Sequence, residues 1–270
     1  MAWTWTRPSR RSRSSDEGGP VYASRVSELA PPSVDPESLL AQAKTLVDAA
    51  AADGLAMRLL GGLAVYAVAP SARHPPLQRR YRDFDLAVPS KKGPAASRIL
   101  EAAGLSPDRH FNALHGARRM IFASPNGYAV DVLVGTFQMA HSLEIEDGFD
   151  ADPLTIAPAD LLLTKLQIVQ IETKDLTDAA AMLLDVEIDV DRFVRPLADD
   201  WGFFHTVEQN LAKLAAFGAA TLEPDPALVL ADRIGILSEA MQGVPRSFRW
   251  KLRARLGERV LWYQTPEEVD

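Results

Sequence analysis

The sequence has 270 residues, of which 47% are hydrophobic and 24% charged, proportions that are ordinary for a globular protein. A formal net charge of −7 argues against a protein that coats nucleic acid, and the absence of cysteine excludes disulfides, thiolate catalysis and Cys-ligated metal centres. No apolar run approaches the roughly 20 residues that span a bilayer, and we find no signal peptide. We therefore expect a cytoplasmic protein with no membrane partner.

The N-terminal part combines a polar tail with a first helix. Residues 1–34 are rich in Arg, Ser, Pro and Gly and show no periodicity, which is typical of a disordered tail. Asp35 is suited to an N-cap and Pro36 to the first helical position, so a helix is predicted from there to a stop near Gly54.

A glycine doublet follows this helix. Met57–Leu60 reads as a short apolar strand that runs directly into Gly61-Gly62, and Leu63–Val68 fits a buried helix. Residues 71–80 form a basic, Pro-containing loop, in which we expect Arg79 to be solvated.

The next strand, Arg82–Val88, carries two aspartates. At period two, Asp83 and Asp85 share one face of the strand, although aspartate is a poor strand former. At about 4 Å two carboxylates repel by roughly 4 kcal/mol at an effective dielectric near 20. A bound cation would remove this repulsion, so the pair predicts a metal site.

A helix over Lys91–Ala103 and a hairpin come next. Arg118–Ala123 and Tyr128–Val134 flank a turn containing Asn126-Gly127, a strong hairpin signal. Asp131 lies in the middle of the otherwise apolar second strand. His110 and His115, which precede the hairpin, are predicted to flank a loop.

Beyond about residue 150 the pattern is helical. Helices are predicted over Pro158–Ile171, Lys174–Leu184, Asp191–Leu197, Thr206–Phe217, Pro226–Met241 and Ser247–Leu256. The predicted fold is α/β (α+β), with a small mixed sheet over residues 35–150 and a helical C-terminal domain over 151–270.

These motifs together predict a phosphate chemistry. If the strand of Asp131 lies beside that of Asp83 and Asp85, three carboxylates form a hard oxygen-ligand set of the kind that Mg²⁺ prefers. Gly61 and Gly62 would let a backbone approach phosphates closely at the start of a helix.

The sequence resembles the nucleotidyltransferase superfamily with the DNA polymerase β-like fold, and within it the bacterial members with an AbiEii-type toxin domain. The resemblance covers roughly residues 55–185. The matching motifs are Leu59-Leu60-Gly61-Gly62-Leu63-Ala64, Asp83-Phe84-Asp85-Leu86, Val130-Asp131-Val132-Leu133, Asp160-Leu161-Leu162-Leu163-Thr164-Lys165 and Lys174-Asp175-Leu176-Thr177-Asp178.

The resemblance implies a role for each matching residue. Gly61 and Gly62 would form the nucleotide-phosphate turn. Asp83 and Asp85 would hold Mg²⁺, and Asp131 would both ligate a metal and act as the base toward the acceptor hydroxyl.

The resemblance also assigns the helical side of the site. Lys165 would neutralise the triphosphate, and Asp175 or Asp178 would bind sugar or base, or orient Lys165. A serine or threonine often follows the family's glycines, but Leu63 and Ala64 follow here.

The implied activity is transfer of a nucleoside monophosphate from an NTP to a hydroxyl of RNA, protein or a small molecule. The protein could then be the toxin of a toxin–antitoxin pair, with an antitoxin protein as partner. Two alternatives stay open: a nucleotide-binding protein without turnover, and a metal-dependent phosphoesterase.

A basic run near the C-terminus is not part of these motifs. Six cations fall within 14 residues, interleaved with Phe248 and Trp250; they are Arg246, Arg249, Lys251, Arg253, Arg255 and Arg259. Such a run predicts either a solvated face or a surface for a polyanionic partner.

Overall fold

The fold is that of a computed structural model, which describes residues 35–264. The tail predicted over residues 1–34 lies outside the described residues. Residues 35–264 all belong to one compact unit, which is described below. The separation of that unit into two domains near residue 150 stays a prediction.

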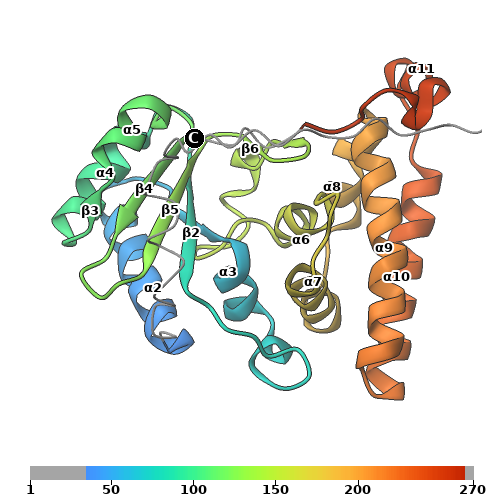
Figure 1. Ribbon diagram of the computed structural model, residues 1–270, viewed down its shortest axis with the longest axis horizontal. Helices are drawn as coiled ribbons and strands as arrows, with labels where there is room; N and C mark the ends of the chain where they lie inside the picture. Colours follow the sequence, from blue (N-terminus) through green and yellow to red (C-terminus); the bar gives the residue numbers. More distant parts are fainter. Residues whose placement is uncertain (1–34, 265–270) are drawn as a thin grey trace, which may run out of the picture. The chain divides into compact units, whose positions relative to one another are not determined.

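A five-stranded mixed sheet forms the N-terminal half, as predicted. Its strands follow the order β1-β2-β5-β4-β3, and only the central pair β2–β5 is parallel. Figure 1 shows β2, β5 and β4 side by side. The strands are β1 (Arg58–Leu60), β2 (Asp83–Val88), β3 (Ser106–Pro107), β4 (Arg119–Ala123) and β5 (Ala129–Val134).

Alternation along the central strands separates an apolar face from an acidic one. Phe84 and Leu86 of β2, with Val130 and Val132 of β5, are at most 1% exposed. The aspartates of both strands therefore lie on the other face of the sheet. The prediction that the strand of Asp131 lies beside that of Asp85 is confirmed.

Four helices accompany the sheet: α2 (Pro36–Ala52), α3 (Gly61–Val68), α4 (Gly93–Ala102) and α5 (Arg109–His115). The Asp35 side chain accepts a hydrogen bond from the Ser38 N–H (3.0 Å), which confirms the predicted cap. The prediction of a loop around His110 and His115 is wrong, because both residues lie on α5. Its cap is Asp108, whose carboxylate accepts from the Phe111 N–H.

A small hairpin after the sheet, β6 (Phe137–Gln138) paired with β7 (Ser142–Leu143), was not predicted. Beyond it, residues 154–156 cover the outer edge of β1. The Leu59 N–H donates to the Leu154 carbonyl (2.7 Å), and the Ile156 N–H donates to the Leu59 carbonyl (3.1 Å). This return segment ties the sheet to the helices that follow it.

The C-terminal half is helical, as predicted. Its helices are α6 (Pro158–Leu166), α7 (Thr173–Asp185), α8 (Val190–Val194), α9 (Trp201–Thr221), α10 (Pro224–Gly243) and α11 (Phe248–Leu256). Short 3₁₀ turns occur at Pro70–Arg73, Glu146–Gly148, Pro196–Ala198 and Gly257–Arg259. Figure 1 shows α9 and α10 running along each other, with α11 beyond one end of them. None of the helices within residues 35–264 is both long and apolar enough to cross a bilayer.

Several predicted helix boundaries in this half are wrong. The first helix ends at Leu166 rather than Ile171, and the third gives way to a 3₁₀ turn at Pro196. Helix α9 begins at Trp201, five residues before the predicted start, because the Asp200 carboxylate accepts a hydrogen bond from the Phe203 N–H (3.1 Å).

Candidate active site

The glycine doublet makes room for two side chains of opposite charge. Gly61 has φ +71°, and a Cβ added there would lie 1.9 Å from Asp85 Oδ2. A Cβ on Gly62 would lie 1.7 Å from Arg79 Nη2. A side chain at either position would displace the end of Asp85 or of Arg79, and the φ of Gly61 is one that other residues rarely adopt. Whether the doublet also contacts a phosphate stays a prediction.

Asp85 and Asp131 lie side by side on the parallel strands β2 and β5, where they are partners in register. Asp83, two residues earlier on the same face, is exposed. Burial raises the pKa of Asp85 to about 7, and the charges of Asp131 and Asp83 act in the same direction. The structure thus brings the three predicted carboxylates to one face of the sheet, at a cost in electrostatic repulsion.

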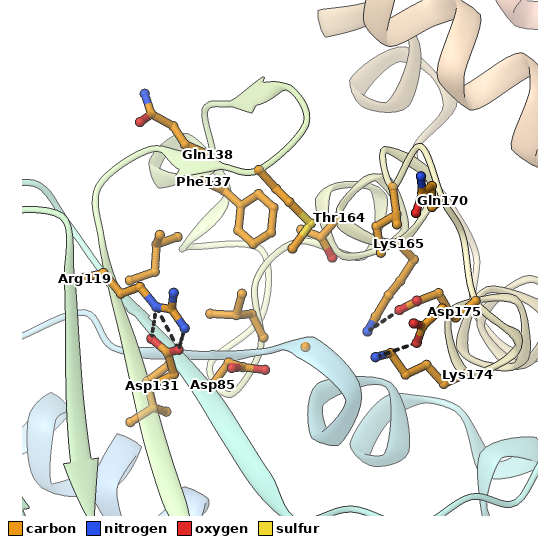
Figure 2. Close-up of a pocket in the computed structure, with 17 residues that line it drawn as sticks. Asp85, Arg119, Asp131, Phe137, Gln138, Thr164, Lys165, Gln170, Lys174 and Asp175 are labelled. Atoms are coloured by element: carbon orange, nitrogen blue, oxygen red, sulfur yellow. Dashed lines mark hydrogen bonds and ion pairs between the residues drawn. The ribbon is translucent and has the colours of Figure 1, made fainter. Parts of the chain in front are cut away.

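Arg119 compensates part of that repulsion. From the neighbouring strand β4, its Nε lies 3.0 and 2.9 Å from the two carboxylate oxygens of Asp131, and its Nη2 donates to Oδ2 (Figure 2). Sequence reasoning missed this residue. The register of the hairpin would have indicated this contact. Asp131 pairs with Ile121, and Arg119 lies two residues before Ile121, on the same face of the sheet as Asp131.

The donor set suits Mg²⁺ in chemistry, although Asp131 is held by another partner. Clustered carboxylates are hard oxygen ligands, and the raised pKa of Asp85 indicates a position where a cation would be stabilising. Within residues 35–264, however, no three acidic or histidine side chains are already arranged to hold a metal. A metal bound by all three aspartates would have to displace the Arg119 guanidinium from the Asp131 carboxylate.

The helical wall of the site contains a buried ion-pair network. Lys165 Nζ lies 2.9 Å from Asp178 Oδ2 and 3.6 Å from Asp175 Oδ1. Arg79 donates to both oxygens of Asp178, from Nε at 2.7 Å and from Nη2 at 2.8 Å, and its guanidinium lies over the ring of Tyr81. The prediction that Arg79 is solvated is therefore wrong.

Asp175 and Asp178 have different environments in this network, which suit them to different roles. Asp178 is 1% exposed and lies between two cations, which suits orientation of Lys165 rather than contact with a ligand. Asp175 borders the cavity, and burial raises the pKa of its carboxyl against the lowering effect of Lys165. Asp160, at the start of the same motif as Lys165, faces elsewhere and pairs with Arg192 (Nε–Oδ1 2.9 Å).

A cavity of about 440 Å³ connects the carboxylates with Lys165. Figure 2 shows Asp85 and Asp131 on one side and Lys165 with Asp175 on the other. Asp83, Gly62 and Asp178, all predicted site residues, do not line it. The lining residues are Leu60, Gly61, Asp85, Leu86, Arg119, Asp131, Leu133, Phe137, Gln138, Met139, Thr164, Lys165, Ile168, Gln170, Glu172, Lys174 and Asp175.

The β6–β7 hairpin contributes Phe137, Gln138 and Met139 to this cavity, and its turn is anchored in the helical half. His141 stacks on Phe203 at a ring distance of 4.9 Å, and its Nε2 lies 3.0 Å from Thr206 Oγ1. Burial lowers the pKa of His141 to about 4, so the ring is neutral at pH 7.

Two hydrogen bonds donated by backbone N–H groups complete the anchor of the hairpin. The His141 N–H donates to Gln167 Oε1 (3.0 Å), and the Gln264 N–H donates to the Ala140 carbonyl (2.8 Å). Trp262 also reaches this region, where its Nε1 lies 3.2 Å from Thr206 Oγ1. Helices α6 and α9 and the segment after α11 thus hold the hairpin over the cavity.

Two solved structures are similar to the chain at low sequence identity. Neither a protein-family model nor a curated protein sequence matches the chain. A lincosamide antibiotic adenylyltransferase, LnuA, solved with lincomycin bound, is 15% identical with a TM-score of 0.38, over 52% of this chain and 92% of that one. An antigenic nucleotidyltransferase-like protein from Paracoccidioides brasiliensis is 13% identical with a TM-score of 0.37, over 78% of this chain and 95% of that one. Likeness at this level does not assign an activity.

Proposed function

We propose that the chain is a nucleotidyltransferase that transfers a nucleoside monophosphate from an NTP to a hydroxyl group and releases pyrophosphate. The observation that carries the proposal is the cavity in which Asp85 and Asp131 face Lys165, and which Gly61 also lines. Its volume of about 440 Å³ lies within the range of roughly 300–1,000 Å³ that is usual for ligand pockets. Carboxylates for a metal and a lysine for phosphate are the two charge types that phosphoryl transfer needs.

In the proposed reaction the acceptor oxygen forms a bond to the α-phosphorus of the NTP, and the bond from that phosphorus to the pyrophosphate oxygen breaks. The proton of the hydroxyl passes to the Asp131 carboxylate, which we assign as base from the family resemblance. Lys165, oriented by Asp178, would bind the triphosphate as a cation.

Asp83, Asp85 and Asp131 would hold Mg²⁺ in this proposal. When bound, the ion would neutralise phosphate charge and favour ionisation of the acceptor hydroxyl. Burial and the acidic neighbours raise the pKa of Asp85 to about 7. This supports the assignment, because a divalent cation would offset the electrostatic cost of ionising Asp85.

The acceptor, and with it the biological role, belongs to the same proposal. RNA, a protein side chain and a small molecule all provide hydroxyls, and we infer an AbiEii-type toxin role if the acceptor is RNA or protein. A neighbouring gene for a small DNA-binding protein whose product neutralises the activity would support that role. Its absence would favour a small-molecule acceptor.

The test is label transfer from each of the four α-³²P NTPs, in Mg²⁺, with total RNA or cell protein as acceptor. Wild type should transfer label and release pyrophosphate, whereas Asp85→Asn should do neither. Asp48→Asn is the matched control, since Asp48 is exposed on α2 away from the cavity. Transfer by Asp85→Asn at the wild-type rate would refute the assignment, and release of inorganic phosphate alone would indicate a phosphoesterase.

A second candidate, nucleotide binding without turnover, is favoured by one contact. Both carboxylate oxygens of Asp131 accept hydrogen bonds from Arg119, which leaves the assigned base already paired. In that case wild type and Asp85→Asn would bind NTP equally, and neither would transfer label.

A further inference from the structure

Exposed apolar side chains are concentrated on the last two helices and the segment after them. Of the ten large hydrophobic residues exposed within residues 35–264, eight lie beyond residue 224, and six of these belong to α10 or α11. The most exposed are Phe248 at 82% and Leu228 at 70%. Patches of this kind usually mark a surface that another molecule covers.

The apolar stripe on α11 is basic at its margins. Phe248, Leu252 and Leu256 are spaced by four residues, so they line one face of the helix, and each is at least 48% exposed. Lys251 and Arg255 lie on the same face, three and seven residues after Phe248, and both are exposed. The ion pairs within residues 35–264 involve other cations.

The apolar stripe on α10 is acidic. Leu228 and Ile236, 70% and 50% exposed, lie on one face with Asp232 between them and Glu239 one turn further on. Neither Asp232 nor Glu239 takes part in an ion pair within residues 35–264. Gly235 lies on this face with open space where a Cβ would be, so a partner helix could approach closely.

We propose that these two faces bind each other between two copies of the chain, with α11 of one copy on α10 of its partner. The stripes match in length, since Phe248–Leu256 and Leu228–Ile236 each contain nine residues, a rise of about 12 Å from first to last. The charges beside them are opposite, with Lys251 and Arg255 on one face and Asp232 and Glu239 on the other. A two-fold axis would form the contact twice and close the assembly as a dimer.

The pairing of the two faces favours a second copy over other anionic partners. An RNA backbone or an anionic lipid surface would satisfy the cations of α11 but would be repelled by the acids of α10 and by the net charge of −7. Leucine side chains also find no apolar contact on a phosphate backbone. Within one chain the two faces do not cover each other, since both are exposed and α11 packs against α9.

The test is the mass of the chain in solution, measured by sedimentation over a hundredfold range of concentration. Wild type should form a dimer, and Leu252→Asp should weaken dimerisation at least tenfold. Leu114→Asp is the matched control, because Leu114 is 67% exposed on α5, outside both stripes. Melting temperatures of both variants near that of wild type would establish that they fold.

Charge reversal tests the specific pairing. Lys251→Glu with Arg255→Glu should abolish the dimer, and adding Asp232→Lys with Glu239→Lys to the same chain should restore it. A monomeric wild type would overturn the proposal, whether or not it binds RNA or vesicles of anionic lipid. A dimer that survives Leu252→Asp, or that the four-residue charge exchange does not restore, would also overturn it.

Discussion

Replacing Arg119 with alanine is expected to tighten Mg²⁺ binding. In the structure Arg119 occupies both oxygens of Asp131, one of the three proposed metal ligands. Metal and guanidinium therefore compete for the same carboxylate. The variant removes both the competitor and a positive charge next to the metal position.

The size of the effect follows from electrostatics. The Arg119 side chain is 51% exposed and that of Asp131 25%, so the dielectric constant of water gives a lower bound for the effect. A divalent ion about 5 Å from the guanidinium is then repelled by about 1.7 kcal/mol, which corresponds to roughly a tenfold to twentyfold change in the dissociation constant. Without metal, the variant should lose about 0.5–1 kcal/mol of stability, as is usual for a half-exposed ion pair.

Titration calorimetry with Mg²⁺ measures the affinity, and urea unfolding without metal measures the stability. Arg118→Ala is the matched control, because it removes the same charge from the neighbouring residue, whose side chain donates to Gln138 instead. Equal or weaker Mg²⁺ affinity in Arg119→Ala than in Arg118→Ala would refute competition between Arg119 and the metal.

Three further predictions concern the residues around the cavity. The pKa of Asp85 is raised from 3.8 to about 7 in the folded state, so stability should fall as pH rises through that range. Asp85→Asn should therefore be more stable than wild type at pH 8, by at most about 4 kcal/mol, and lose that advantage near pH 4 in metal-free urea unfolding. Lys165→Ala should weaken NTP binding in a fluorescence titration by more than it lowers stability, because Asp178 would still be paired with Arg79. Unchanged NTP affinity would exclude Lys165 from the site. Gly61→Ala should cost about 1–3 kcal/mol more than Gly54→Ala in thermal unfolding. Both glycines have φ near +70°, but a Cβ would meet another side chain only at Gly61, so equal losses would contradict the steric role of Asp85.

Local patterns were enough to predict the sheet and the acidic face. Alternation placed Asp83 and Asp85 on one side of a strand, and the Asn126-Gly127 turn fixed the hairpin that carries Asp131. Lys165 lies within an apolar run, and in the structure it is 9% exposed with its Nζ 2.9 Å from Asp178 Oδ2.

The partners of these residues could not be predicted in the same way. Arg79 pairs with Asp178 across 99 positions of sequence, and no local pattern distinguishes it from its neighbour Arg80. The β6–β7 hairpin has strands of two residues each, too short for an alternation to be visible. Its position depends on contacts of His141 with α9, which exist only in the folded chain.

The anchoring of the β6–β7 hairpin has a consequence for the order in which the protein is completed during translation. Asp85, Asp131 and Lys165 are all synthesised by residue 165, yet the hairpin that covers them is tied to Thr206 and Gln264. A ribosome that has made the sheet and α6 has therefore made the carboxylates of the sheet and Lys165, but neither Asp178, which orients that lysine, nor the contacts that fix one wall of the cavity. The nascent chain acquires the finished pocket only when the last of the described residues has emerged.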